Sequence, residues 1–417
     1  MAIATARTMD ILPPRPQLNL PREPWKFSNL QRVIDTLACT ELCTTIGCLE
    51  AALPVVSGPQ YVFHNGALAE NLSGSAVLAH GVTLETTEHQ TPNTEHRTRD
   101  ALDTLPLTAG VTHTLHVTGK GKLPLHLIHV ASGEPSTSRF RIELEAGAEL
   151  TLIEHQVAAP HFTTWQNLGV EIVLAEGAVL THSVQQTLPP TCVLSRRTFV
   201  SLADTATYSA TTFQSGSTFS RIETHAELAS STTFRHIGLS LARREQHHDC
   251  TLHVRHKGTA NSTHIRQRNL IDDKAHAVFQ GKFHVDQAAQ KTDAYMHCHN
   301  LLLNDTARAS HKPELEIYAD DVKCSHGAAT GGLNANQLFY LEARGFTPAQ
   351  ATALLTEGFV NEFIDEFPEV LRKNMALALQ QWQANVVDTA DPTPDFGMDA
   401  IRRETDLPLV PEIVIES

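Results

Sequence analysis

The sequence predicts a mainly β protein whose central part is a β-helix, or solenoid, between helical regions at the two ends. Residues 105–330 are rich in Thr, Val, Ile, Leu and His in alternating runs, which is typical of half-buried strands. A seven-residue motif recurs through the same stretch. We therefore divide the chain into an extended and helical region at 1–104, a β core at 105–330, a helical domain at 331–388 and a tail at 389–417, which we expect to be mobile.

The N-terminal region begins with a Pro-rich stretch of about 22 residues that we expect to be extended. From Ser28 onward, apolar residues recur at helical spacing as far as Leu49. Cys39 and Cys43 are four residues apart and would lie on one face of this helix. They are either a ligand pair or small buried apolar side chains, and the second interpretation is favoured.

The repeated motif consists of an apolar residue, a polar turn, a small residue and a second apolar position. Its copies begin at residues 144, 174, 202, 228, 271 and 303, so successive copies are 30, 28, 26, 43 and 32 residues apart. The first copy is Leu144-Glu-Ala-Gly-Ala148-Glu-Leu150. Repeats of this length indicate one strand–turn–strand unit stacked on the next. A β-sandwich would not require such a repeat. We expect the step of 43 to contain an insertion around Arg243–Asn261.

The C-terminal region shows three helical segments. The first spans residues 334–344, and Gly345 is suited to end it. In the second, Thr347, Pro348 and Gln350 are predicted to act as N-cap, first helical residue and capping-box partner. This helix has an apolar face that must be buried against another surface. The third segment spans residues 368–382.

Composition and charge exclude several classes of function. The 417 residues carry a formal charge of −14, which argues against a nucleic-acid partner. The seven cysteines are spread along the chain and do not form the dense framework of a secreted disulfide protein. No signal-peptide pattern precedes residue 17, and no stretch is long and apolar enough for a membrane span. We expect a cytoplasmic protein with reduced thiols.

One short segment combines a thiol and an imidazole at strand spacing. Cys324 and His326 are two residues apart, so a strand would project both side chains from one face, and Lys323 would favour the thiolate. These ligand types suit iron, zinc or a cluster. Two ligands do not complete a coordination sphere. Either a second chain supplies the rest, or the pair is structural.

Two further polar clusters are weaker candidates. His297, Cys298 and His299 would place two imidazoles on one strand face and the thiol on the other. A third cluster contains four histidines and one aspartate: His247, His248, Asp249, His253 and His256. Ordinary solvated strand residues are the favoured interpretation of both.

The sequence also lacks the signals of several enzyme classes. It has no phosphate-binding loop and no nucleophile elbow, so we expect no nucleotide bound by this chain. A β-helical carbohydrate-active enzyme would need paired carboxylates on one face. Asp272-Asp273 and Asp320-Asp321 are adjacent, and a strand would point the two members of each pair in opposite directions.

Several longer motifs resemble the SufB/SufD family of iron–sulfur cluster assembly scaffold proteins, the SufD branch more than the SufB branch. The most specific is Lys312-Pro-Glu-Leu-Glu-Ile-Tyr-Ala-Asp-Asp-Val-Lys-Cys-Ser-His-Gly327, followed by Gln337-Leu-Phe-Tyr-Leu-Glu-Ala-Arg-Gly345. The helix containing Leu354-Leu355 and Gly358-Phe359 continues the similarity. Phe279-Gln-Gly-Lys282, Ala289-Gln-Lys-Thr-Asp293 and Arg22-Glu-Pro-Trp-Lys-Phe27 extend it upstream.

The resemblance implies a right-handed parallel β-helix that pairs with a SufB-like subunit or with itself. It implies iron or a transient iron–sulfur cluster at the shared interface, with His326 facing the partner's cysteine and Cys324 beside it. It also implies that a SufC-like ABC ATPase docks on the C-terminal helices. The apolar face of the second helix suggests this docking surface, with Leu354, Leu355, Phe359 and Phe363. The alternative is a β-helical or cupin-like metalloprotein that acts alone.

Overall fold

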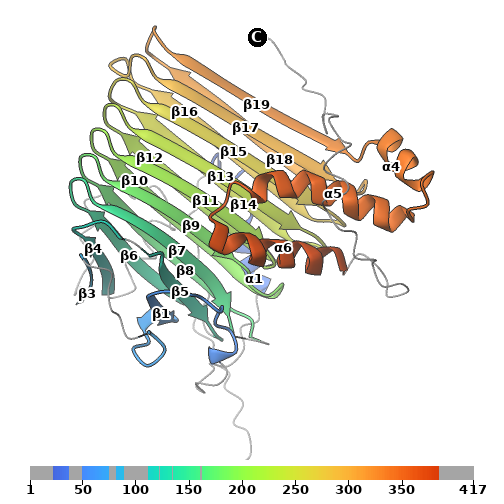
Figure 1. The fold of residues 1–417 in the computed structure, drawn as a ribbon, viewed down its shortest axis with the longest axis horizontal. Helices are drawn as coiled ribbons and strands as arrows, with labels where there is room; N and C mark the ends of the chain where they lie inside the picture. Colours follow the sequence, from blue (N-terminus) through green and yellow to red (C-terminus); the bar gives the residue numbers. More distant parts are fainter. Residues whose placement is uncertain are drawn as a thin grey trace, which may run out of the picture.

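The computed structural model describes residues 22–36, 49–74, 81–88, 111–121, 123–133, 135–159 and 162–384. Most of these residues form two long sheets that lie face to face, as the stacked strands in Figure 1 show. The two cysteines Cys39 and Cys43, which were predicted to share a helix face, and the tail at 389–417 lie outside the described residues.

From β4 onward, consecutive strands alternate between the two sheets, and each strand pairs in parallel with the strand one coil further on. In chain order, sheet A contains β1 (Gln60–His64), β2 (Ala67–Leu68), β5 (Leu125–Ala131), β7 (Glu149–Ala158), β9 (Val179–Gln186), β11 (Thr207–Ser215), β13 (Thr233–Ala242), β15 (Ser262–Ile271), β17 (Asp293–Leu302) and β19 (Lys323–Gly332). Sheet B contains β3 (Val82–Glu88), β4 (Val111–Val117), β6 (Ser136–Leu144), β8 (Trp165–Leu174), β10 (Val193–Leu202), β12 (Phe219–Leu228), β14 (His247–His256), β16 (His276–Val285) and β18 (Arg308–Ile317). This arrangement is a parallel β-solenoid of about seven turns and confirms the predicted fold class.

The repeated heptapeptide forms the turns between the sheets. In the first four copies the backbone at the fourth position adopts the left-handed conformation, with φ of 68° at Gly147 and 60° at Thr205, whereas in the copy at 271 the third position, Asp273, adopts it, with φ of 54°. Glycine or a short polar residue is tolerated best there. The small residue that follows is buried, as at Ala148 and Ala206.

The expected insertion at 243–261 is wrong. The first four copies of the motif connect sheet B to sheet A, whereas the copies at 271 and 303 connect sheet A to sheet B at the opposite end of the strands. The step of 43 residues therefore spans one and a half coils. Residues 243–261 form a turn, the strand β14 and another turn, and β14 pairs in unbroken register with its neighbours β12 and β16.

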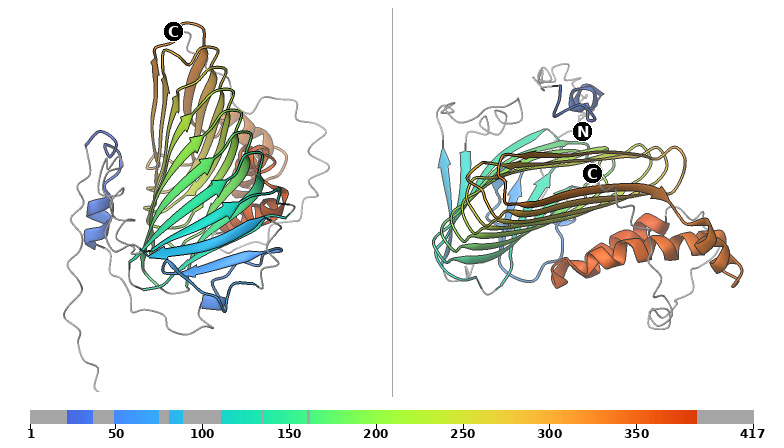
Figure 2. Two further views of the ribbon diagram at one scale, coloured as in Figure 1. Left: turned by 90° about the vertical axis from the view of Figure 1, so that its left-hand side faces the viewer. Right: turned by 90° about the horizontal axis from the view of Figure 1, so that it is seen from above.

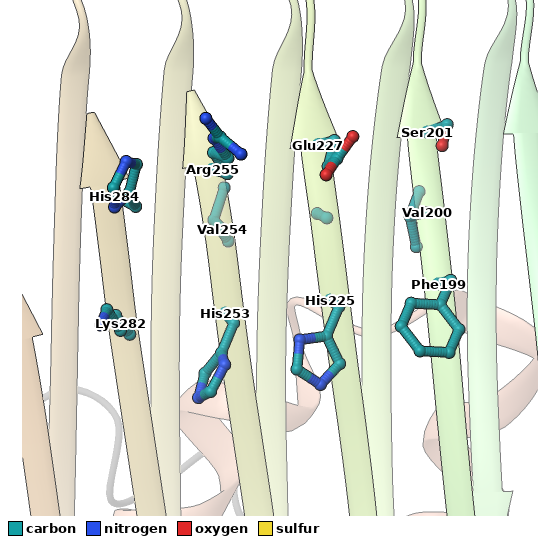
Figure 3. A pocket seen from close by; sticks show the side chains of 11 residues that line it. Phe199, Val200, Ser201, His225, Glu227, His253, Val254, Arg255, Lys282 and His284 are labelled. Atoms are coloured by element: carbon teal, nitrogen blue, oxygen red, sulfur yellow. The ribbon is translucent and has the colours of Figure 1, made fainter. Parts of the chain in front are cut away.

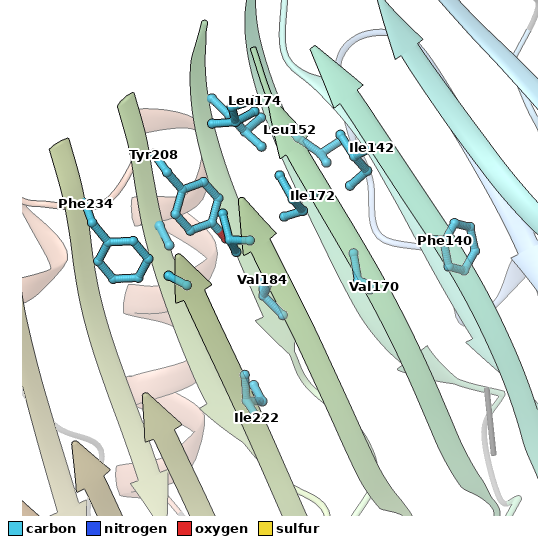
Figure 4. Packing of buried hydrophobic residues seen from close by; sticks show 14 of the residues in the cluster. Phe140, Ile142, Leu152, Val170, Ile172, Leu174, Val184, Tyr208, Ile222 and Phe234 are labelled. Carbon is cyan, nitrogen blue, oxygen red and sulfur yellow. The ribbon is translucent and has the colours of Figure 1, made fainter. Parts of the chain in front are cut away.

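The core fills the space between the sheets. Strands alternate buried and less buried positions, most clearly in β6. The inward residues form one continuous apolar cluster, part of which is shown in Figure 4, where Ile142, Ile172 and Leu152 meet between the sheets. The sheets also begin earlier than residue 105, where the sequence analysis placed the start of the β core, because β1 already pairs with β5.

The two ends of the solenoid differ. At the N-terminal end, β2 and β3 pair antiparallel with β1 and β4 and close the two sheets. At the other end β19 and β18 are the outermost strands of sheets A and B among the described residues. The last coil is therefore open.

Helices cover the outer faces of the sheets on opposite sides, as Figure 2 shows. Trp25 and α1 (Leu30–Thr36) pack on sheet B against Trp165, Val193 and Phe219. Helices α5 (Pro348–Ile364) and α6 (Glu369–Ala384) pack on sheet A, and α4 (Ala335–Glu342) has no buried residue.

Two of the predicted helix signals are confirmed. Thr347 and Gln350 form the capping box that begins α5. Gly345 has φ of 95° after α4. In the described part of the chain, no helix is long and apolar enough to cross a membrane.

Candidate functional site

Cys324 and His326 lie on the inner face of β19, at the open end of the solenoid. Their partners on β17 are Ala294 and Met296, which are both fully buried in the core. The alternation of a strand therefore directs Cys324 and His326 toward the core as well. Cys324 is half-buried and His326 is exposed, because no further coil covers them.

The local charge does not activate the thiol. Burial raises the pKa of the Cys324 thiol, and the nearby Asp293 carboxylate raises it further. The expectation that Lys323 favours the thiolate is therefore wrong, because desolvation and Asp293 dominate. In the resting chain Cys324 is a neutral thiol near neutral pH.

The pair does not amount to a complete metal site. No group of three or more His, Cys, Asp or Glu residues within the described ranges is arranged to hold a metal ion. An ion bound beside Cys324 and His326 must therefore take further ligands from water, from another part of this chain or from a second chain.

The surroundings of the pair favour contact with another chain. Both edge strands are ten residues long, and Leu315 and Ala328 are only partly buried against the core. Ile317 is 38% exposed and Tyr318 is 61% exposed. Long unprotected edges expose rows of backbone donors and acceptors that readily pair with another strand.

The other candidate clusters are split by strand alternation. Cys298 is fully buried, with its Sγ 3.7 Å from Asn269 Nδ2, and burial raises its pKa to about 12. His297 and His299 are on the opposite, outer face of β17, where burial lowers the pKa of His299. These three residues do not form one site.

The cluster on β14 is also divided between two faces. His248 points inward and is 2.7 Å from the Gly216 carbonyl oxygen, and His256 is fully buried. On the outer face, Asp249 pairs with Arg221 at 2.6 Å. Of the two aspartate pairs, Asp272 accepts a hydrogen bond from the side chain of Asn304 and Asp273 accepts one from a turn amide.

A groove of about 450 Å³ crosses the outer face of sheet B (Figure 3). Its lining side chains stand in two rows across neighbouring strands: Phe199, His225, His253 and Lys282 in one row, and Ser201, Glu227, Arg255 and His284 in the other. Sequence reasoning missed it because its residues come from four strands. Its cations are already paired, Lys282 with Glu316 at 2.5 Å and Arg255 with Asp286 at 3.1 Å, so its charge selects no class of ligand.

A second unpredicted feature is an ionic network inside the core. The Glu154 carboxylate is bonded to both terminal nitrogens of Arg196 at 2.7 and 2.9 Å, to His182 at 2.8 Å and to His129 at 3.1 Å. Burial alone would raise the pKa of Glu154, but the Arg196 charge and the two histidines hold it well below its usual range. The sequence signal was a charged residue at an inward strand position.

The residues predicted to dock a partner ATPase are placed differently from the expectation. Phe359 and Phe363 are 7% and 2% exposed and pack on the chain's own sheet A, where Phe363 also lies under Arg266 and Arg268. The prediction that Phe359 and Phe363 contact a partner is therefore wrong. The residues Leu354 and Leu355 are half-buried.

The exposed apolar residues of the helical domain lie elsewhere. On α4, Phe339 is 72% exposed and Tyr340 is 52% exposed. On α6, Leu377 is 52% exposed and Val370 is 42% exposed.

The chain is similar to one protein family and to several known proteins. Residues 127–359 match the family described as the SUF system FeS cluster assembly, SufBD core domain. A SufBD family iron–sulfur cluster assembly protein of Synechocystis sp. is 29% identical in an alignment 378 residues long that covers 83% of this chain and 83% of its own. Iron-sulfur cluster assembly protein SufD of Escherichia coli is 34% identical over 61% of this chain and 62% of its own length. Protein ABCI7, chloroplastic, of Arabidopsis thaliana is 32% identical over 56% of this chain and 50% of its own.

Proposed function

Because this chain belongs to the SufBD family of iron–sulfur cluster assembly proteins and is SufD-like, we propose that it is a non-enzymatic scaffold subunit of a cytoplasmic assembly complex. It pairs with a SufB-like subunit and shares with it a site for iron or a nascent cluster. The observation that carries the proposal is the position of His326 and Cys324 at the uncovered end of a solenoid, where the described residues of this chain supply only part of a ligand set.

The partner subunit joins the open end. Strands β18 and β19 present two parallel edges, and the half-buried Leu315 and Ala328 between them complete their burial when another coil stacks over them. A SufB-like subunit offers a related solenoid end and the missing ligands. A second copy of this chain has the same edges and is the alternative occupant.

Iron and sulfide are the cargo of this site. The imidazole of His326 is a suitable nitrogen ligand for ferrous iron. Cys324 binds as a thiolate, so it releases its proton when the metal arrives. The interface excludes water only after the two subunits have paired, and it must open again for the cargo to enter or leave.

An ABC-type ATPase supplies the energy for this opening. We place its docking surface on α4, around Phe339 and Tyr340, with Leu354 and Leu355 of α5 as the neighbouring half-buried residues. Since α5 packs on sheet A through Phe359 and Phe363, a movement of the docked ATPase is transmitted to the solenoid.

The test of the shared site is His326→Ala in the co-expressed complex. We expect the subunits to co-purify as in the wild type while the yield of iron and cluster falls. His264→Ala is the matched control, since His264 is also exposed but lies on the outer face of sheet A. Unchanged cluster yield in His326→Ala would assign this histidine a structural role.

The test of ATPase docking is Phe339→Asp, with Leu377→Asp on α6 as the control of similar exposure. We expect the first variant to lose the ATPase from the purified complex and the second to retain it. Both residues are exposed, so neither substitution disturbs the core. Full ATPase retention in Phe339→Asp would refute docking at α4.

A fully ligated metal on the isolated chain would favour the alternative function, a metalloprotein that acts alone.

A further inference from the structure

The open end of the solenoid contains one more histidine, on the sheet opposite to His326. His311 belongs to β18 and pairs in register with Phe279 of β16. Phe279 is fully buried in the core, so strand alternation directs His311 toward the core as well. His311 is nevertheless exposed, because β18 is the last strand of sheet B in the described chain.

Contacts one coil below show which residues of the two sheets face each other. A Cβ atom added to Gly281 of β16 would lie 2.1 Å from Met296 Sδ of β17, so these two residues are opposite each other across the core. Pro313 stacks on Gly281 and His326 stacks on Met296. His326 therefore faces Pro313 across the open end.

His311 lies one inward position away from the Pro313 that faces His326. His311 is the inward residue that precedes Pro313 on β18, about 6.6 Å along the strand. It faces Ala328, the inward residue that follows His326 on β19. Proline and alanine are small, so they leave room between the sheets for the two imidazoles to turn toward each other.

We propose that His311 and His326 together hold the incoming ferrous ion, one imidazole from each sheet, before the partner subunit adds its own ligands. The inference rests on the proposed function, which it deepens by naming a second ligand. Imidazole nitrogen suits ferrous iron, and two imidazoles leave coordination positions for water, sulfide or a partner thiolate.

The pair of His311 and His326 also accounts for the one-sided position of the ligands described so far. Cys324 and His326 alone come from a single strand edge and leave the opposite sheet without a ligand. With His311, both sheets of the last coil contribute, so the ion lies across the mouth of the core. The partner's end coil would then cover the ion from above.

The experiment is an anaerobic titration of the full-length chain with ferrous iron, without any partner. The variants are His311→Ala, His326→Ala, the double variant and the control His264→Ala. Coordinated imidazoles are counted by pulsed EPR of the ferrous–nitrosyl adduct. We expect two imidazoles in the wild type and in the control, and one in each of the single variants.

The expected affinities follow from a shared ion. Each single substitution weakens iron binding by about tenfold or more, since even loss of an outer partner of a metal ligand costs about 10–100-fold. The double variant binds iron more weakly than either single variant, but by less than the product of the two single losses, because the two ligands act on one ion.

The outcomes separate this inference from the proposed function. Normal binding in His311→Ala with weakened binding in His326→Ala would overturn the role of His311 and leave the shared site intact. Normal binding in both would overturn the pair and the iron site at His326 together. Iron without coordinated imidazole in the wild type would overturn the pair, whereas the scaffold function is judged separately by cluster yield in the complex.

Discussion

Glu154→Gln tests the ionic network in the core of the solenoid. The Arg196 guanidinium is 1% exposed, and Glu154 is its counter-charge, bonded to both of its terminal nitrogens. Glutamine keeps the shape of the side chain but removes the negative charge, and its amide group presents a donor where a carboxylate oxygen accepted. The guanidinium charge is then buried without compensation.

The magnitude follows from this loss. Breaking a buried ion pair by removing one partner costs about 3–5 kcal/mol. For roughly 300 ordered residues, an unfolding entropy of about 2.1 cal/mol/K per residue corresponds to about 0.6 kcal/mol per degree. Glu154→Gln should therefore lower Tm by about 5–8 °C. Glu316→Gln is the surface control, because Glu316 is 43% exposed and its pair with Lys282 contributes about 1 kcal/mol or less.

The assay is equilibrium urea denaturation and calorimetry of the wild type, Glu154→Gln, Glu316→Gln and the double variant Glu154→Gln with Arg196→Met. The double variant should recover part of the loss, because it removes the uncompensated charge. Equal Tm values for Glu154→Gln and Glu316→Gln would refute the reasoning, since the buried carboxylate would then contribute no more than one at the surface.

Three further outcomes are expected. The difference in unfolding free energy between wild type and Glu154→Gln should be constant from pH 8 to 5 and shrink below about pH 4.5. The reason is that the pKa of Glu154 is lower in the folded chain than its unfolded value of 4.5. The stabilisation by the carboxylate is therefore complete above the unfolded pKa and is lost as pH falls toward the folded pKa. Phe363→Ala should cost about 3–5 kcal/mol, measured by urea denaturation, and release α5 first in hydrogen exchange. Gly147→Ala should lower the free energy of unfolding by only about 1–2 kcal/mol through backbone strain, because nothing lies within 4 Å of the added Cβ. Gly216→Ala should cost more, because its Cβ would lie 1.9 Å from a carbonyl oxygen. Similar losses for the two variants in urea denaturation would count against the predicted clash.

Local sequence signals were sufficient for much of the fold. In the four copies that connect sheet B to sheet A, the heptapeptide marks turns because its fourth position adopts a left-handed backbone and the residue after it is buried, and both are local requirements. The capping box at Thr347 is local as well. The supposed insertion arose because turns at the two ends of the strands have the same pattern, and the sequence alone does not distinguish them.

The apolar face of α5 shows the limit of the same reasoning. Its spacing correctly required burial of Phe359 and Phe363, but the pattern is identical whether the covering surface belongs to the same chain or to a partner. The structure shows that sheet A covers them. The sequence did not single out the exposed Phe339 and Tyr340 of α4, because the exposure of an apolar side chain depends on whether another element covers the helix.

Local patterns along the chain are enough to predict a stack of strands and to place Cys324 and His326 on one strand face, since alternation and turn geometry depend only on near neighbours. The folded chain is needed to show that this face lies on the last, uncovered coil and that His311 lies on the opposite sheet. Those relations depend on how residues about one coil apart stack and on where stacking stops, and no local pattern in the chain encodes either.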